Sequence, residues 1–237
     1  MTQVDPFAEA YERENPTFGE APSPEVAAVL KQCGLRGHGL DVGAGLGRNA
    51  IAMARAGLRT EAIDVSETAV TRLRARAADA GLSESINAVC ADVRTYDRKD
   101  SSYALIVAAT VLDHLSAPDG RDVLRRLTGA LAPDGLLFVE VHTTEDPGCR
   151  GAGPTSECAT AIEHYYRPGE LLELARPWLR IIRYEERFEW DHTHGREHRH
   201  AKASLLATRP DANPRFFGVP THVRGSAPAE GRLPNRL

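Results

Sequence analysis

A turn with three alternating glycines constrains this chain more than any other feature of its sequence. Residues 40–49 read Leu-Asp-Val-Gly-Ala-Gly-Leu-Gly-Arg-Asn, so an apolar run ends at Val42 and a helix-compatible segment follows. Glycine accepts the positive φ angles of such a turn and lets a ligand approach the backbone closely. The first N–H groups of the next helix point toward negative charge. The turn therefore predicts a strand, a ligand-binding loop and a helix in succession.

The spacing of glycines and acids narrows the class of ligand that the turn can bind. A dinucleotide site follows Gly-x-Gly-x-x-Gly, but Arg48 stands here at the third glycine position. One acid, Asp41, lies in the strand end, and Asp64 ends the next apolar run, 64 − 43 = 21 residues after Gly43. An acid at this distance reaches the hydroxyls of a ribose. The pattern predicts a ribose-containing ligand and weakens the alternative of an NAD-dependent oxidoreductase.

With Asp-x-Gly-x-Gly-x-Gly at 41–47, Asp64 after the second strand and Asp92 after the third, the chain resembles the Rossmann-like (class I) S-adenosylmethionine-dependent methyltransferases. The resemblance implies that Asp41 meets the cofactor's amino group, directly or through water. It also implies that Asp64 binds the ribose and Asp92 the adenine. This cofactor has no pyrophosphate, so it needs no third dinucleotide glycine. The implied cofactor-binding residues are Asp41, Gly43, Ala44, Gly45, Gly47, Arg48, Asn49, Asp64, Val65, Asp92, Val93, Ala108 and Ala109.

Further motifs are similar to those of the tellurite-resistance methyltransferases and their small-molecule relatives. They are Gly-Arg-Asn at 47–49 followed by Ile-Ala at 51–52, the run 107–112, and Tyr-Arg-Pro-Gly-Glu-Leu at 166–171. The chain departs from this pattern at Ala44, where a cysteine is common, and at Ala104, where strand four often carries an aspartate. These departures leave the subfamily and the substrate open.

The order of apolar runs and helical patterns predicts an α/β fold. The expected strands are 39–42, 60–64, 88–91, 103–108 and 136–141, and the expected helices are 23–34, 48–57, 66–81 and 118–131. Two long runs, 181–190 and 199–208, flank a short polar stretch and predict a terminal hairpin. We expect a doubly wound, mostly parallel seven-stranded sheet ending in an antiparallel β-hairpin strand, which is the Rossmann-like methyltransferase fold.

Composition is typical of one enzyme domain, with 42% hydrophobic and 26% charged residues among 237. We predict an N-terminal lid at 1–22, a methyltransferase domain at 23–208 and an extended tail rich in proline and glycine at 209–237. A net charge of −4 argues against nucleic acid as a partner. The lack of a long apolar run or signal segment predicts no membrane association and a cytoplasmic location. Nothing in the sequence indicates an oligomeric state.

The spacing of cysteines and histidines bears on metal binding. The four cysteines show no C-x-x-C pair, so neither a zinc ribbon nor a redox pair is indicated. Cys33 and Cys90 are expected in the core, and the roles of Cys149 and Cys158 stay open. The densest histidine cluster is His192, His194, His198 and His200, and three of its nitrogens have the spacing for a metal. Because no cysteine or clear acidic ligand completes the set, we favour an exposed rim at the hairpin tip without metal.

In open α/β sheets the ligand lies beyond the carboxyl ends of the strands. The acceptor is therefore expected against strands four and five, near the stretch that starts at Glu163, with the N-terminal lid above it. The predicted substrate-binding residues are Tyr11, Phe18, Thr110, Asp113, His164, Tyr165 and Tyr166.

A sulfonium is already an activated leaving group, so the enzyme's main task is to align the nucleophile and the methyl carbon in a dry pocket. A thiolate needs no base, whereas an oxygen or nitrogen nucleophile must lose a proton. His114 and His142 are the predicted catalytic residues for that step. We expect methyl transfer from S-adenosyl-L-methionine to an O, N or S atom of a small molecule, such as a natural-product intermediate. A non-catalytic cofactor-binding sensor or partner subunit is the alternative outside enzymes.

Overall fold

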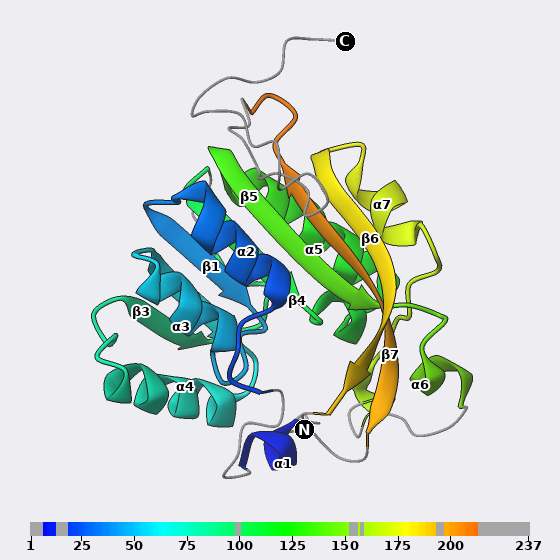
Figure 1. The fold of residues 1–237 in the computed structure, drawn as a ribbon, viewed down its shortest axis with the longest axis horizontal. Helices are drawn as coiled ribbons and strands as arrows, with labels where there is room; N and C mark the ends of the chain where they lie inside the picture. The colour runs from blue at the N-terminus through cyan, green and yellow to red at the C-terminus, as the bar shows by residue number, and fades with distance from the viewer. Residues whose placement is uncertain are drawn as a thin grey trace, which may run out of the picture.

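A computed structural model describes residues 7–12, 19–97, 101–151, 156, 159–192 and 197–212. In these residues a sheet of seven strands lies between helices on both faces (Figure 1). The strands are β1 (His38–Val42), β2 (Arg59–Asp64), β3 (Ile86–Cys90), β4 (Tyr103–Ala109), β5 (Leu131–His142), β6 (Arg180–Asp191) and β7 (His198–Thr208). The helices are α1 (Ala8–Glu12), α2 (Pro24–Cys33), α3 (Arg48–Arg55), α4 (Glu67–Asp79), α5 (Ala117–Ala130), α6 (Pro147–Arg150) and α7 (Glu170–Ala175), with 3-10 turns η1 (Leu112–His114) and η2 (Ala159–Ala161).

The strand order is β3-β2-β1-β4-β5-β7-β6. Strands β1 to β5 pair in parallel, whereas β7 pairs antiparallel with both β5 and β6. The chain reverses its direction of winding between β3 and β4, so a crevice opens beside β1 at the carboxyl ends of the strands. The predicted fold class, including the terminal hairpin, is confirmed.

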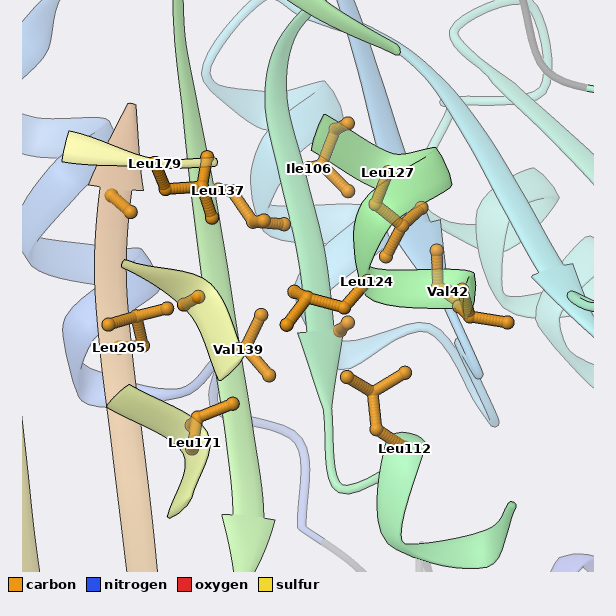
Figure 2. Packing of buried hydrophobic residues seen from close by; sticks show 14 of the residues in the cluster. Val42, Ile106, Leu112, Leu124, Leu127, Leu137, Val139, Leu171, Leu179 and Leu205 are labelled. Carbon is orange, nitrogen blue, oxygen red and sulfur yellow. The ribbon is translucent and has the colours of Figure 1, made fainter. Parts of the chain in front are cut away.

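Alternation along the central strands sends side chains to two separate cores. On one face, Ile106 of β4 and Val139 of β5 pack with Leu124 of α5 and Leu171 of α7 (Figure 2). On the other face, Val107 and its neighbours pack against α2 and α3. Successive strand residues point to opposite faces, so an apolar run such as 105–109 supplies both cores.

The predicted helix boundaries hold to within a few residues, and some of the expected capping residues act as caps. Ser66 accepts a hydrogen bond from the N–H of Ala69 at the start of α4, and Gly34 ends α2 with φ 55°. Ser23 stands at the N-terminus of α2, but its side chain makes no capping bond. Its N–H instead donates to Oδ1 of Asn49 at 2.9 Å, which ties α2 to the start of α3.

Two local expectations were wrong. The strand expected at 136–141 begins earlier, at Leu131: Tyr103 pairs with Leu131 and Leu105 with Leu136, so the residues between Leu131 and Leu136 bulge from the ladder. Cys90, the last residue of the edge strand β3, is exposed rather than buried.

Parts of three predictions lie outside the described residues. These parts are Phe18 and most of the lid, Cys158, and the tail beyond residue 212, so the predicted domain boundaries stay predictions. In the described part of the N-terminal segment, α1 packs near α4, and Arg72 donates to the backbone oxygen of Tyr11. No helix in the described ranges is long and apolar enough to cross a membrane.

Candidate active site

A cleft of about 600 Å³ opens at the carboxyl ends of the parallel strands. Its lining comes from the segments that follow β1, β2, β3, β4 and β5, together with α1, Ser156, residues from 159–163, the end of β6 and the start of β7. Most of the lining segments are loops held by the ends of rigid strands. Loops mounted in this way are the usual positions for binding residues in α/β folds.

The glycine loop lies at one end of the cleft. Gly43, Gly45 and Gly47 have φ angles of 63°, 52° and 82°, a region that residues with a Cβ rarely adopt. A Cβ on Gly45 would lie 3.2 Å from the hydroxyl of Tyr11. A Cβ on Gly47 would collide with Leu73 of α4. Gly45 therefore keeps the loop open beside the cleft, whereas Gly47 lets a helix pack closely behind it.

Two of the three acids singled out in the sequence line the cleft. Asp64 accepts hydrogen bonds from the N–H groups of Gly45 at 2.8 Å and Ser66 at 2.9 Å, which fix its carboxylate at the tip of β2. Asp92 lies after β3 and pairs with Arg94 through its side chain. The hydrogen bond from Arg94 lowers the pKa of Asp92, so this acid is ionised.

The third acid, Asp41, is buried behind the loop rather than in the cleft lining. It accepts a hydrogen bond from the N–H of Ala50 at 2.8 Å and so holds the first turn of α3 against β1. Burial raises the pKa of Asp41 to about 7 despite that hydrogen bond.

The other end of the cleft contains an aspartate–histidine pair. Nδ1 of His142, the last residue of β5, lies 2.6 Å from Oδ2 of Asp113 in η1. Asp113 is fully buried; burial acts to raise its pKa, but the charge of His114 and the hydrogen bonds from His142 outweigh it and hold the pKa at about 2. The ionised carboxylate therefore accepts the Nδ1 proton and leaves Nε2 of His142 for other contacts.

His114 and Thr110 line the middle of the cleft. Nδ1 of His114 lies 2.8 Å from the backbone oxygen of Ala161, and its ring meets the ring of Phe7 edge to face at 4.9 Å. Thr110 has φ 51°, which is unusual for a β-branched residue, and its N–H donates to the oxygen of Glu140. Backbone strain of this kind concentrates at functional sites.

The predicted exposed histidine rim was partly wrong. His198 and His200 are 1% and 4% exposed, because every second residue at the start of β7 turns inward past the end of β5. Nδ1 of His200 lies 3.0 Å from Oδ2 of Asp146, and its ring lies 4.7 Å from that of His142. His192 is exposed as expected, and His194 lies outside the described residues.

A buried network of charges continues from the histidines along the hairpin. Glu140 of β5 receives Arg187 at 2.7 Å and Lys202 at 3.5 Å, and Lys202 also pairs with Glu189. Burial acts to lower the pKa of Lys202, but the two glutamates outweigh it and raise that pKa. Lys202 is therefore a cation at the cleft wall, with its charge balanced on both sides.

The structure brings most of the predicted residues to this one cleft. The lining includes His114, His142, Gly43, Ala44, Gly45, Arg48, Asn49, Asp64, Val65, Asp92, Val93, Ala109, Tyr11 and Thr110. It does not include Asp41, Gly47, Ala108, Asp113, His164, Tyr165 or Tyr166. Asp113 acts through His142, and Tyr166 is 2% exposed within the core that contains α7.

Sequence reasoning did not assign Asp146, Glu189 or Lys202 to the cleft, and it expected His200 on an exposed rim. The alternation His-x-His-x-Lys at 198–202 was the available signal, since three polar side chains on one face of a strand demand a polar partner. Asp146 carried a weaker signal, as an aspartate directly before Pro147 at a helix start.

Comparison with known proteins agrees with this geometry. Residues 40–135 match the family model described as a methyltransferase domain. The fold is similar to TehB from Haemophilus influenzae, with a TM-score of 0.66 and 17% identity over 86% of this chain and 65% of TehB. The chain thus spans less than two thirds of TehB's length.

Two further structures resemble the chain over nearly their whole length. The CcbJ methyltransferase from Streptomyces caelestis has a TM-score of 0.63 at 19% identity, covering 86% of this chain and 96% of CcbJ. The N-methyltransferase NodS from Bradyrhizobium japonicum, in complex with S-adenosyl-L-homocysteine, has a TM-score of 0.61 at 18% identity, covering 85% of this chain and 95% of NodS. Residues 40–135 therefore match a methyltransferase domain, and the chain has the fold of the class I S-adenosylmethionine-dependent methyltransferases.

Proposed function

We propose that the protein transfers the methyl group of S-adenosylmethionine to an oxygen, nitrogen or sulfur atom of a small organic molecule. One observation carries this proposal: the cleft joins the glycine loop and Asp64 at one end to the Asp113-backed His142 at the other. One end suits the cofactor and the other suits a group that must lose a proton.

The cofactor end fits S-adenosylmethionine by its donor set. Gly45 keeps the loop free of side-chain atoms where a ligand passes, and Asp64 and Asp92 supply carboxylates for ribose and adenine groups. When bound there, the cofactor supplies a methyl group on a sulfonium, an activated leaving group. Exposed Val65, beside Asp64 in the lining, offers an apolar surface for a planar base.

The acceptor end supplies a base. Asp113 holds Nδ1 of His142, so Nε2 accepts the proton that an alcohol or amine loses as it attacks. Asp113 is a positioning residue, and its ionised state stabilises the imidazolium that forms. His114 is the second candidate base, because its Nδ1 also bonds a backbone oxygen and its ring lines the same cleft.

The cleft walls support an organic acceptor. Ser156, Ala159, Ala161 and Ile162 belong to the segment after α6 and line the cleft, so the wall near His114 is shaped by small and apolar residues. NodS, which has the same fold, is named as an N-methyltransferase, and this supports a nitrogen atom among the proposed acceptors. The position of α1 beside the glycine loop supports the proposed N-terminal lid. The proposed methyltransferase domain then spans 23–208, and the proposed tail spans 209–237.

Formation of S-adenosylhomocysteine with a panel of alcohol, amine and thiol acceptors tests the proposal. We expect His142→Ala to lower kcat for alcohols and amines by about 10²- to 10⁴-fold, with a smaller loss for thiols above their pKa. His38→Ala, at the opposite end of β1, is the matched control.

Calorimetric titration separates the alternatives. A non-catalytic sensor or partner subunit would bind S-adenosylmethionine and yield no product with any acceptor. An oxidoreductase would bind NAD in preference. Equal alcohol methylation by wild type and the His142→Ala variant would exclude His142 as the base.

A further inference from the structure

We infer that the acceptor end of the cleft contains a binding site for one divalent transition-metal ion, formed by His142, Asp146 and His200. One donor atom from each of the three side chains lies within 4.8 Å of the other two. All three residues are buried, at 8%, 3% and 4% exposure, and all three line the cleft. Two imidazoles and one carboxylate form the donor set of many open zinc and non-haem iron sites.

The donor spacing suits a small cation. Nδ1 of His200 and Oδ2 of Asp146 lie 3.0 Å apart. Two ligands at about 2.1 Å from a metal and at right angles to each other lie about 3.0 Å apart, so this pair already has the spacing of neighbouring ligands. Nδ1 of His142 is engaged by Asp113, which leaves Nε2 as its donor.

The groups behind the three side chains hold them as an outer shell holds metal ligands. A metal-binding histidine commonly donates its second ring N–H to a carboxylate, and Asp113 takes this position behind His142. Asp146 is oriented by two backbone N–H groups, from Gly148 at 2.8 Å and Ala201 at 2.9 Å. The bonds to Asp113, Gly148 and Ala201 can persist when a metal is bound, whereas the hydrogen bond between His200 and Asp146 would be replaced by two bonds to the metal.

The local charge also favours a cation. Two carboxylates lie at the site: Oδ2 of Asp113 is 2.6 Å from Nδ1 of His142, and Oδ2 of Asp146 is 3.0 Å from Nδ1 of His200. The nearby cation Lys202 is paired with Glu140 and Glu189. Three protein ligands leave coordination positions open, and the cleft gives a path for a substrate heteroatom to fill one.

A second group, Asp191, His198 and His200, also meets the spacing criterion. It shares His200 with the first group, but Asp191 is only partly buried. The first group is the assignment, because all three of its residues are buried and carry the supporting contacts described above. The site does not depend on the proposed methyl acceptor. In the metal-free protein Nε2 of His142 stays available as a base, and in the metal-loaded protein it is a ligand.

Direct metal titration tests the site without any activity measurement. Full-length protein freed of metal with a chelator is titrated with Zn²⁺ by calorimetry and with Co²⁺ by visible absorption. We expect one equivalent to bind, with a Co²⁺ d–d spectrum that Zn²⁺ abolishes. His142→Gln, Asp146→Asn and His200→Gln should each weaken binding at least tenfold, and Asp113→Asn by about 10- to 100-fold.

Matched variants separate the site from general histidine binding. His38→Gln, at the far end of β1, and His192→Gln, an exposed histidine of the same cleft, should keep wild-type metal affinity. Affinity for S-adenosylmethionine checks that each variant is folded. One folded variant of a proposed ligand is enough to test the site. Wild-type metal affinity in a folded ligand variant, loss of binding confined to His198→Gln, or no saturable binding by the wild type would overturn the assignment.

Discussion

The two ends of the cleft are built in different ways. At the cofactor end, contiguous loops after β1 and β2 present backbone and one anchored carboxylate, Asp64. At the acceptor end, side chains converge from distant segments: His142, Asp146 and His200 come from β5, the start of α6 and β7. The first end depends on local conformation and the second on tertiary pairing. Substitutions should therefore separate the two ends.

The largest effect is expected at the glycine loop. Gly45→Val puts a β-branched residue at φ 52° and drives its side chain against Tyr11. Strain of about 1 to 3 kcal/mol adds to the blocked approach, so affinity for S-adenosylmethionine should fall more than 100-fold in calorimetry. Gly129→Val, at an exposed position of α5 with open space around it, is the control. Normal binding by Gly45→Val would mean that the loop does not hold the cofactor.

The second-largest effect is expected at the acceptor end of the cleft. Lys202→Met leaves Glu140 and Glu189 without one cation in a buried network, which should lower the free energy of unfolding by about 3 kcal/mol. Urea denaturation measures the loss, and Lys31→Met on the exposed side of α2 is the control. Cofactor affinity should stay within about twofold of wild type. A large drop in that affinity would show that the two ends are coupled.

Asp64→Ala tests the ribose contact that we propose at the cofactor end of the cleft. The change removes an acceptor that fixes Gly45 and faces the cleft, and hydrogen bonds to a charged group contribute about 1.5 to 3 kcal/mol. Affinity for S-adenosylmethionine should fall about 10- to 100-fold. Asp79→Ala, at the exposed end of α4, should leave it unchanged. Equal affinities of the two variants would contradict the ribose assignment.

The smallest effect concerns pH. Burial raises the pKa of Asp41 to about 7, so the folded state holds a proton that the unfolded chain releases near pH 4. Stability therefore decreases as pH rises from about 4 to 7 and is constant above. Asp41→Asn keeps an acceptor for Ala50 and removes this dependence. Its melting temperature should exceed that of wild type at pH 8, and the difference between the two melting temperatures should be smaller at pH 5. A difference that becomes smaller as pH rises would contradict the prediction.

The difference between the ends also explains what the sequence could predict. The loop at 43–49 and the acids at 64 and 92 were readable because glycine spacing and strand-end acids are local patterns. The fold class followed from the order of apolar runs and from the two runs of the hairpin. The burial of His198 and His200 did not follow, because it depends on β7 entering between β5 and β6 rather than lying at the sheet edge.

Tyr166 illustrates the same limit. An aromatic residue before a helix suggested a substrate wall, but the N–H of Tyr166 donates to the oxygen of His142 and its side chain turns into the core. Asp113 lay in the right region, and its contact with His142 spans 29 residues of sequence. Only the pairing of β4 with β5 brings these two groups together.

Because β7 lies between β5 and β6, side chains at the start of this strand can be exchanged without changing the order of the strands. His200 and Lys202 line the cleft and His198 is buried on the same face of the strand, so we expect exchanges of these three side chains to change the proposed acceptor end and to leave the glycine loop intact. A one-residue slip in the pairing of β7 with its neighbours would instead turn all three side chains to the other face of the sheet. Diversification along this lineage is thus expected to proceed by substitution within the strand, with its length held constant.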